Sequence, residues 1–410
     1  MSEWKKVKLG ELYEVHNGLS KGRQFFGTGF PFLTFSNVFN NWFLPDQLES
    51  LVQTTDKERE ACSIKAGDVF ITRTSETMDE LGMSSVALKD YPNATYNGFT
   101  KRLRPITNRV NPRYIGYYLR TPKFRGQFMA FSSMTTRASL ANNDLLNMEV
   151  ELPSMEIQHR IATILSRYDS LIESHLKQIK LLEEAAQRLY KEWFIDLHFP
   201  GHENTKIVDG VPEGWEKKKL CELFSFVRGK SYTSKELSDE GTIMVNLKNI
   251  QSFGGYKSDV EKHFIGTFKE EQTLMKGDLI MGVTDMTQER RLVGSVALIP
   301  DFKETATFSM DLIKLISFKL PNIYLYCAMR YGDVSRQIAP LANGVNVLHL
   351  KPEAISNIEM VVASDSIIEK FVSYTSKTIE NILSLQSQLR LLTEARDRLL
   401  PKLLSGEIEV

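Results

Sequence analysis

The feature that most constrains this sequence is an internal repeat, because the second half of the chain repeats the first. Gly67-Asp68 matches Gly277-Asp278, a shift of 210 residues, and nearly the same shift aligns blocks along both halves. The other matching blocks are Trp4–Leu12 with Trp215–Leu223, Gly18 with Gly229, Thr34–Val38 with Asn246–Ile250, Ser85–Leu88 with Ser295–Leu298, Asn147–Glu149 with Asn357–Glu359, and Leu181–Ala185 with Leu391–Ala395. One register held across so many separate blocks indicates two copies of one structural unit.

The first part of each copy has the pattern of a mixed domain. Short runs rich in β-branched and apolar residues, such as Val69–Thr72 and Leu279–Val283, lie between Gly, Asn and Pro turns and predict strands. Short helices are expected at Pro112–Leu119 and Pro321–Tyr331, each with a proline in its first turn. We therefore expect an α+β fold in which each copy holds a twisted sheet and a few short helices.

The second part of each copy predicts one long helix with a heptad seam, because apolar residues recur at alternating spacings of four and three. The seam residues are Ile157, Ile161, Ile164, Tyr168, Leu171, Leu182, Ala185 and Leu189 in the first copy, and Ile367, Phe371, Tyr374, Ile382, Leu385, Leu392, Ala395 and Leu399 in the second. A single apolar stripe would face water, so we expect the two helices to pack as an antiparallel pair, with a pseudo-two-fold axis relating the copies. His175, Gln178 and Gln388 interrupt the seams, and polar seam residues usually fix the register of a coiled coil.

These patterns divide the chain into five segments. The mixed domains cover residues 1–155 and 215–362, and the long helices cover residues 156–195 and 363–410. A linker at residues 196–214, which contains Pro, Gly and an acidic excess, resets the chain for the second copy. The expected architecture is therefore two repeated mixed domains separated by two long antiparallel coiled-coil helices.

Composition places the chain among globular proteins, with 42% hydrophobic residues, 25% charged residues and a formal net charge of zero. No apolar run reaches the roughly 18 residues that a membrane helix requires, and the first residues lack a signal-peptide pattern. The three cysteines, Cys62, Cys221 and Cys327, lie far apart and indicate neither a disulfide framework nor a zinc site. We therefore expect a cytoplasmic protein.

The distribution of charge is more informative than the net charge. No acidic residue occurs between Asp90 and Asp144, whereas the same stretch contains nine Lys and Arg residues, from Lys101 to Arg137. Such a run is the usual electrostatic footprint of a polyanion-binding surface. A solvated basic face is the alternative explanation, and the sequence does not separate the two.

The order of these motifs resembles the specificity subunits of Type I restriction–modification systems over essentially the whole chain. The segments that carry the resemblance are Trp4–Leu12 and Trp215–Leu223, which look like the family's "W…LGE" opening, Pro31–Val38, which resembles its first conserved strand and turn, Lys65–Thr74 and Lys276–Met281, which look like its "GD" strand, and Leu152-Pro153 with Glu156–Ile161, which resemble the start of its conserved helix. The second copy departs from the pattern at Ser364–Ile368, which lacks the proline and the glutamine.

The resemblance implies a non-catalytic protein in which residues 1–155 and 215–362 are target-recognition domains. Each domain would read one half of a split, asymmetric site in double-stranded DNA, and the helix pair would set the unread gap. Two methylation subunits would bind this chain to form an adenine methyltransferase, and two motor-nuclease (restriction) subunits would add restriction. Those partners would bind S-adenosylmethionine, ATP and Mg²⁺, so we expect no cofactor, metal or membrane contact on this chain.

Sequence-specific readout needs Arg, Lys, Asn and Gln side chains that reach base edges, and positioning needs polar groups near phosphates. Candidates are therefore polar residues in loops between the predicted strands. In the first domain they are Lys21, Arg23, Asn37, Arg73, Thr74, Ser75, Lys101, Arg102, Thr136 and Arg137. In the second domain they are Lys230, Tyr232, Lys248, Asn249, Thr284, Gln288, Arg290, Arg291, Asn343 and Asn346. Arg73 aligns with Val283 and Ser75 with Asp285, so we expect two dissimilar half-sites, and a palindromic target would count against this hypothesis.

Two other classes of protein are the rival interpretations. Phe26–Phe30 superficially resembles the methyl-donor loop of methyltransferases, but the chain has no Asn/Asp-Pro-Pro-Tyr/Phe tetrapeptide, and we interpret the segment as a turn. Gly229-Lys230-Ser231 lacks the first glycine of a phosphate loop, and the seven histidines have no metal-site spacing. These absences argue against a fused enzyme. The alternative is a non-catalytic adaptor that binds proteins through its coiled coil, and a steep salt dependence of DNA affinity would exclude it.

Overall fold

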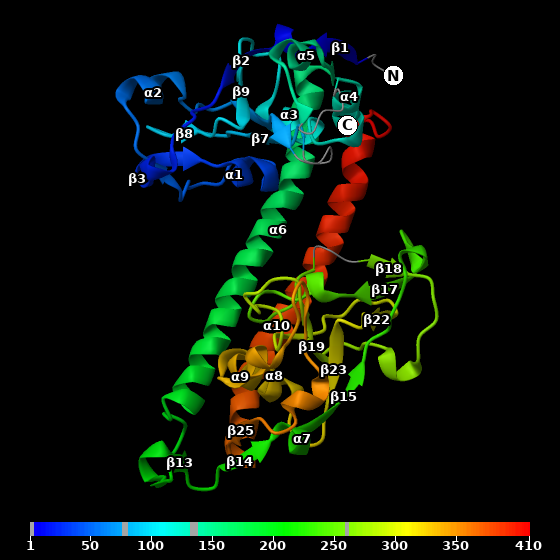
Figure 1. Ribbon diagram of the computed structural model, residues 1–410. Helices are drawn as coiled ribbons and strands as arrows, with labels where there is room; N and C mark the ends of the chain where they lie inside the picture. The colour runs from blue at the N-terminus through cyan, green and yellow to red at the C-terminus, as the bar shows by residue number, and fades with distance from the viewer. Residues whose placement is uncertain (1–3, 76–80, 132–137, 259–261) are drawn as a thin grey trace. The chain divides into compact units, whose positions relative to one another are not determined.

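The computed structural model describes residues 4–75, 81–131, 138–258 and 262–410, which form two compact units. Unit 1 comprises residues 1–169 and 395–410, and unit 2 comprises residues 170–394 (Figure 1). Two long helices, α6 (Met155–Tyr190) and α10 (Asp365–Leu404), each contribute residues to both units. Within the described residues, no helix is both long and apolar enough to cross a membrane.

Each unit contains short strands and short helices in addition to its share of α6 and α10. Unit 1 contains β1 (Lys5–Lys8), β2 (Tyr13–Asn17), β3 (Phe26–Leu33), α1 (Phe35–Asn40), β4 (Leu51–Val52), α2 (Asp56–Ala61), β5 (Val69–Thr72), β6 (Thr74–Ser75), β7 (Ser84–Val86), β8 (Thr95–Tyr96), β9 (Thr100–Pro105), α3 (Pro112–Tyr118), α4 (Pro122–Phe131), β10 (Ala138–Ser139), α5 (Asn142–Asn147) and β11 (Glu149–Leu152). Unit 2 contains β12 (Ile207–Val208), β13 (Val211–Pro212), β14 (Glu216–Lys219), α7 (Leu220–Leu223), β15 (Phe224–Arg228), β16 (Leu237–Ser238), β17 (Thr242–Val245), β18 (Lys262–Phe264), β19 (Leu279–Gly282), β20 (Thr284–Asp285), β21 (Val296–Leu298), β22 (Ala306–Phe308), β23 (Leu312–Ser317), α8 (Asn322–Tyr331), α9 (Val334–Ile338), β24 (Leu348–His349) and β25 (Glu359–Val362).

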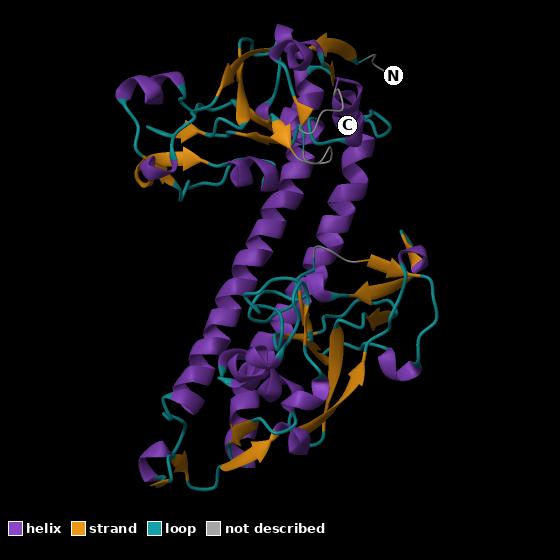
Figure 2. Ribbon diagram, viewed as in Figure 1, coloured by secondary structure: helices purple, strands orange, loops and turns teal. Residues whose placement is uncertain are grey.

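The internal repeat in the sequence corresponds to a repeated sheet topology. Unit 1 has an antiparallel sheet in the order β2-β9-β5-β7, and unit 2 has the matching order β15-β23-β19-β21. Figure 2 shows the strands of both units in orange. Three further pairings recur: β1-β11 with β14-β25, β6-β10 with β20-β24, and the parallel pair β3-β8 with β17-β22. The predicted α+β class is confirmed.

One inner strand of each sheet, β5 or β19, begins with three consecutive apolar residues that are buried on both faces of the sheet. Val69 and Ile71 of β5 belong to one core cluster and Phe70 to another, as the two-residue period of a strand requires. In unit 2, Leu279 and Met281 face one cluster and Ile280 the other. One of the two clusters in each unit includes the short helix α3 or α8 together with residues of α6 and α10.

The repeated Gly-Asp motif forms the turn that leads into β5 in unit 1 and into β19 in unit 2. Gly67 has a φ of +88° and Gly277 a φ of +84°, which is a left-handed conformation that glycine adopts without steric cost. The following aspartate secures the turn, since Asp68 Oδ2 accepts a hydrogen bond from the Lys65 N–H at 2.8 Å and Asp278 Oδ2 accepts one from the Met275 N–H at 2.9 Å. The motif therefore has a structural role in both copies.

Gly18 and Gly229 are explained by a close approach of two backbones. A Cβ atom on Gly18 would lie 2.1 Å from the Asn97 carbonyl oxygen, and one on Gly229 would lie 1.9 Å from the Ser309 carbonyl oxygen. Both distances are too short for any side chain. The same crossing of two loops, at the same point of the repeat, therefore requires glycine in each copy.

The two long helices pack together and run antiparallel, as predicted. Within unit 2, His175 Nε2 lies 2.9 Å from Gln388 Oε1, and the rings of Tyr190 and Phe371 have centroids 6.0 Å apart. Within unit 1, Arg396 Nη1 donates to Asp169 Oδ1 at 2.9 Å. The His175–Gln388 contact joins two of the polar residues that interrupt the predicted seams.

The predicted seam is partly wrong in its choice of inward residues. Leu171 and Tyr374 were assigned to it, but both are exposed, as is Ala185. Ile179 and Ala186 are buried instead, seven residues apart on α6. The reason is that α10 also packs against the domain core of unit 2, so the inward face of each helix is set by more than its helical partner.

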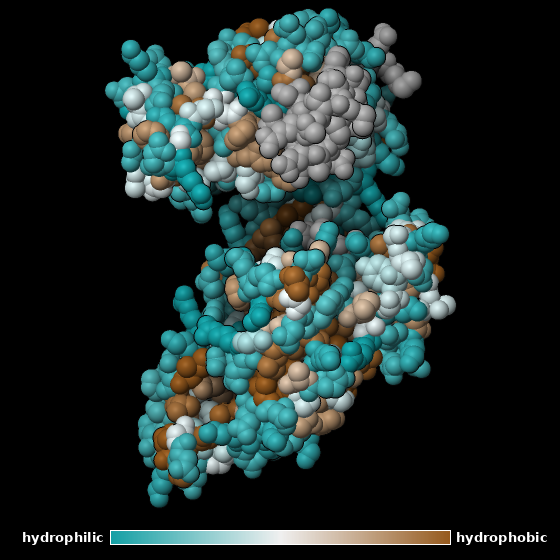
Figure 3. Space-filling view, in the orientation of Figure 1, coloured by the Kyte–Doolittle hydropathy of each residue, from teal (hydrophilic) through white to brown (hydrophobic). Residues whose placement is uncertain are grey.

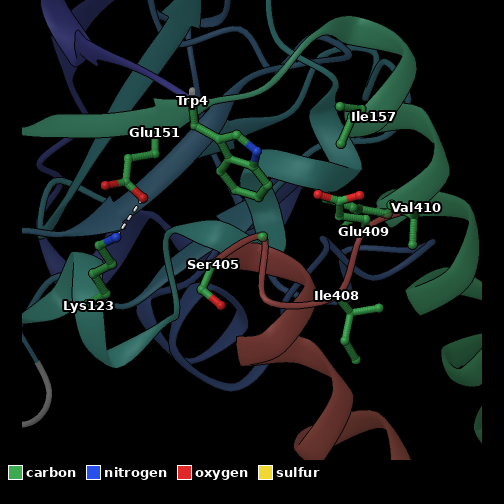
Figure 4. A pocket seen from close by; sticks show the side chains of 10 residues that line it. Trp4, Lys123, Glu151, Ile157, Ser405, Ile408, Glu409 and Val410 are labelled. Atoms are coloured by element: carbon green, nitrogen blue, oxygen red, sulfur yellow. Dashed lines mark hydrogen bonds and ion pairs between the residues drawn. The ribbon is translucent and has the colours of Figure 1, made fainter. Parts of the chain in front are cut away.

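A tryptophan near the start of each copy is covered by the segment that follows a long helix. In unit 2, Trp215 packs against Phe194 and Phe199, with ring centroids 5.7 Å and 5.0 Å apart. In unit 1, Gly406 lies against the indole of Trp4, beside a cavity of about 540 Å³ that is lined by the last residues of the chain, including Ile408 and Val410 (Figure 4). In both units, therefore, the segment after a long helix packs on a tryptophan near the start of the copy.

Candidate nucleic-acid interface

Two loops of unit 2 that the sequence nominated separately meet in the structure. Strands β20 and β24 pair antiparallel, with Thr284 opposite His349 and Asp285 opposite Leu348. This pairing brings the loop at residues 286–292, defined here as the recognition loop, beside the loop at residues 343–347. Gln288 Nε2 donates to the Val345 carbonyl oxygen at 2.8 Å and ties the two loops together. Six predicted residues of unit 2 therefore lie on this pair of strands and loops: Thr284, Gln288, Arg290, Arg291, Asn343 and Asn346.

The ends of these two loops present amide and apolar side chains to solvent. Gln288, Asn343 and Asn346 are exposed, and Val345 and Met286 are 88% and 74% exposed. Amide side chains can pair with adenine, and apolar side chains can contact the thymine methyl group. In the space-filling view, the visible surface of each unit is largely hydrophilic with scattered hydrophobic patches (Figure 3).

A third segment of unit 2, the turn between β22 and β23, lies beside the paired strands β20 and β24. The Val283 N–H donates to the Asp311 carbonyl at 2.9 Å, and the Met310 N–H donates to the Lys230 carbonyl at 3.0 Å. Lys230, a predicted contact, therefore lies in the loop that crosses the β22–β23 turn. Tyr232 is half-buried with its ring near that of Phe264, and burial raises the pKa of its hydroxyl.

Asp285 organises the recognition loop from within. It is buried, and its Oδ1 accepts hydrogen bonds from the Thr287 N–H at 2.7 Å and the Thr287 hydroxyl at 2.8 Å. Its Oδ2 accepts a third hydrogen bond from the Leu292 N–H at 2.8 Å. Thr284 is also buried, with its hydroxyl 3.3 Å from His349 Nδ1. Asp285 and Thr284 therefore shape the loop. The alignment of Asp285 with Ser75 did not indicate this structural role.

The equivalent strands of unit 1, β6 and β10, pair in the same way. Ser75 lies opposite Ala138 and Thr74 opposite Ser139, and the Arg73 N–H donates to the Phe99 carbonyl at 3.0 Å, as Val283 does to Asp311. Thr136 and Arg137, with the predicted polar loop around them, lie outside the described residues. The structure therefore places only the base of this predicted site.

Two predicted asparagines have structural partners in the free chain. The Thr34 N–H donates to Asn37 Oδ1, and the Asn246 N–H donates to Asn249 Oδ1, at 3.0 Å in both cases. Each asparagine therefore closes a capping box at the start of a helical turn. Asn249 is also buried, whereas its neighbour Lys248 is exposed. Equivalent positions in the two copies were nominated for DNA, and the structure gives them the same capping role.

Three predicted cations of unit 1 are likewise engaged within the fold. Arg102 is buried and donates to the Ser63 carbonyl at 2.7 Å, and the equivalent Lys314 of unit 2 donates to the Thr273 carbonyl at 2.7 Å. Lys101 is buried and donates to Asn142 Oδ1, and burial together with the nearby Arg73 guanidinium lowers the pKa of its ammonium group. The third is Lys21, which pairs with Glu58 at 2.8 Å, whereas Arg23 is exposed.

The basic run at residues 101–137 is not a continuous basic face. Arg104 forms an ion pair with the buried Asp68 at 2.6 Å, and Lys123 pairs with Glu151 at 2.6 Å. Arg120 donates to the carbonyls of Val38, Phe39 and Asn41, and burial lowers its pKa to about 10. Much of this positive charge therefore holds the fold together, which the sequence pattern could not distinguish from a surface charge.

The segment that resembles a methyl-donor loop is a strand and not the predicted turn. Phe26–Phe30 belongs to β3, and its pairing with Val52 shifts register between Phe26 and Phe30, as in a β-bulge. Gly27 and Gly29, both with positive φ, accommodate this irregularity. Among the described residues, no group of three or more His, Cys, Asp or Glu side chains is arranged to hold a metal ion.

The comparisons with known proteins agree with this geometry. Residues 1–184 match a family model described as the Type I restriction modification DNA specificity domain. The chain is 26% identical to the specificity subunit of the Type I restriction enzyme MjaIX of Methanocaldococcus jannaschii, an alignment that covers 100% of this chain and 94% of that protein. Over its whole length the chain is therefore similar to the specificity subunits of Type I restriction–modification systems. A specificity subunit is a non-catalytic component of such a system, and it supplies the DNA specificity.

Two further comparisons extend over the full length of this chain. It is 22% identical to the specificity subunit of the Type I restriction enzyme HindI of Haemophilus influenzae, with 100% of each chain covered. The crystal structure of the Type I restriction–modification S subunit from M. genitalium shares its fold, with a TM-score of 0.59, 15% identity, and coverage of 98% of this chain and 96% of that one.

Proposed function

We propose that this chain is a Type I specificity subunit that reads a split, asymmetric DNA target, with each unit contacting one half-site. The observation that carries the proposal is that the same antiparallel strand pair recurs in both units, β6-β10 in one and β20-β24 in the other, with different residues at equivalent positions. A shared scaffold with unlike loops is what two related readers of unlike sequences require.

In unit 2 we assign base contacts to the exposed amides Gln288, Asn343 and Asn346, because amides read adenine through paired hydrogen bonds. Lys230 and Lys248 are assigned to phosphates. Thr284, Asn249 and Tyr232 support the loops that carry these residues, since all three are buried or half-buried.

In unit 1 the corresponding proposal rests on fewer described side chains. The proposed contacts are Arg23, which is exposed, Arg73, whose N–H donates to the Phe99 carbonyl, and Thr74 and Ser75 of β6. Thr136 and Arg137 are proposed from the sequence alone. Lys21, Asn37, Lys101 and Arg102 are assigned a supporting role because each has a partner within the fold.

The proposed partners follow from the similarity to Type I specificity subunits. We propose that two methylation subunits and two restriction subunits assemble with this chain on double-stranded DNA in the cytoplasm. S-adenosylmethionine, ATP and Mg²⁺ would be bound by those subunits, and no residue of this chain is assigned to them.

The test is to co-express this chain with its methylation subunit in a host that lacks adenine methylation, and to map methyladenine across the genome. A motif with two dissimilar halves and a fixed gap, lost when this chain is omitted, would support the proposal. A palindromic motif would contradict it. If the two proteins associate but no motif is found, and the complex shows no salt-dependent affinity for duplex DNA, the adaptor alternative is favoured.

A further inference from the structure

A cavity of about 680 Å³ opens beside the recognition loop of unit 2. Its walls come from residues 252–254, the end of the recognition loop at residues 289–291, the α8–α9 region and Gln187 of α6. We propose that this pocket binds the sugar–phosphate backbone of the DNA strand whose bases the recognition loop reads. The proposal rests on the proposed function and adds a binding site of different chemistry.

The pocket carries more positive than negative charge. Four arginines line it: Arg290, Arg291, Arg330 and Arg336. Arg330 is neutralised by Glu183, with N–O distances of 2.8 Å and 3.0 Å, and Arg291 by Glu289 at 2.7 Å.

The positive charges of the other two arginines, Arg290 and Arg336, are not compensated in this way and are available to a ligand. Arg336 lies 4.0 Å from Asp333, and the two side chains are 88% and 71% exposed, so water screens their attraction. Arg290 has a buried Nε that makes no hydrogen bond within the described part of the chain. A phosphodiester supplies acceptor oxygens and negative charge that suit both guanidinium groups.

The backbone of the pocket has the strain that functional sites store. Phe253 has a φ of +67° and Arg290 a φ of +53°, although residues with a Cβ rarely adopt this left-handed conformation. The Phe253 N–H donates to the Arg291 carbonyl at 3.0 Å, so the two strained segments hold each other. The Phe253 ring is 69% exposed at the rim, where it can pack against a deoxyribose.

The position of the pocket favours the DNA strand over a free anion. Gln288 at the exposed part of the recognition loop and Arg290 in the pocket are two residues apart, so their Cα atoms lie within about 7 Å. A DNA strand whose bases contact Gln288 therefore has its sugar–phosphate backbone close to Arg290. A pocket that holds phosphates should contribute affinity without sequence preference.

The experiment compares the wild-type complex of this chain and its methylation subunits with Arg290→Gln and Arg336→Gln complexes. Affinity is measured against salt concentration for a duplex that carries the mapped motif and for an unrelated duplex. Each variant should bind both duplexes more weakly, with the slope of log K against log salt reduced by about 1, and should leave the methylated motif unchanged. Arg336→Lys should restore the slope because it restores the charge. Lys303→Gln removes an exposed cation elsewhere in unit 2 and should have no effect.

Substitution of single phosphates by methylphosphonate would locate the contact, since the wild type should lose affinity at a phosphate where the Arg336→Gln complex loses none. An unchanged salt slope in both Gln variants, with the wild type still selecting its motif, would overturn the pocket and leave the proposed function intact. An altered motif would assign these arginines to bases and also overturn it. A wild-type complex that does not prefer the motif duplex would overturn both proposals.

Discussion

Asp285 and Leu292 stand at the two ends of the recognition loop and are joined by a hydrogen bond of 2.8 Å from the Leu292 N–H to Asp285 Oδ2. The other oxygen of the same buried carboxylate is bonded to Thr287. One side chain therefore fixes the loop at its start and at its end, while the residues between them are exposed except for the half-buried Arg290.

We predict that Asp285→Ala relaxes this loop and reduces methylation at the unit 2 half-site. Loss of three hydrogen bonds to a buried carboxylate should also lower the stability of the chain by about 1 to 3 kcal/mol. Methyladenine mapping, together with thermal unfolding, measures both effects. The exposed neighbour Gln288 provides the control, since Gln288→Ala should alter recognition with little loss of stability. A faithful, fully methylated motif in the Asp285→Ala complex would contradict the prediction.

The ion pair between Arg330 of α8 and Glu183 of α6 is almost buried, with side-chain exposures of 11% and 14%. Removing one partner leaves the other charge without compensation, so Glu183→Ala should destabilise the chain by about 3 to 5 kcal/mol. The exposed pair Lys177–Glu173 on the same helix is the matched control, and Glu173→Ala should cost less than about 1 kcal/mol. Denaturant unfolding checks this, and equal effects of the two variants would show that burial does not govern the cost.

Gly229→Ala should destabilise the chain because its Cβ would lie 1.9 Å from the Ser309 carbonyl oxygen. Gly18→Ala should behave in the same way in unit 1. Gly126 of α4 has nothing within 4 Å of a built Cβ, so Gly126→Ala should be neutral or stabilising by up to about 1 kcal/mol. Unfolding midpoints for the three variants test whether the crossing, and not glycine itself, is the requirement.

The three cysteines should differ sharply in their reactivity toward a thiol reagent. Cys221 is exposed, whereas Cys62 and Cys327 are buried. Burial raises the pKa of the Cys327 thiol to about 12, and the thiolate is the reactive form. A thiol reagent should therefore label one thiol of the folded chain rapidly, and Cys221→Ser should abolish this rapid labelling. Rapid labelling of two or three thiols under native conditions would contradict the burial of Cys62 and Cys327.

The sequence determined the repeat and, through it, much of the fold. Gly67-Asp68 and Gly277-Asp278 mark a turn whose geometry is local, because it depends on one positive φ and one side-chain bond to a residue three positions earlier. The long helices could also be predicted, because helical periodicity is a property of neighbouring residues. The loops nominated in unit 2 were also the loops that the structure joins at Gln288 and Val345.

Only the tertiary structure decided which polar residues face outward. Arg102, Arg104 and Arg120 look like surface charge in the sequence, but each is bonded to a carbonyl or carboxylate that lies at least 36 residues away along the chain. The exposure of Leu171 and Tyr374 is of the same kind, because the domain core competes with the partner helix for the inward face. Periodicity and composition describe what a residue can do locally. Its burial and its partners depend on segments brought together by folding, and that information is not contained in any short stretch of the chain.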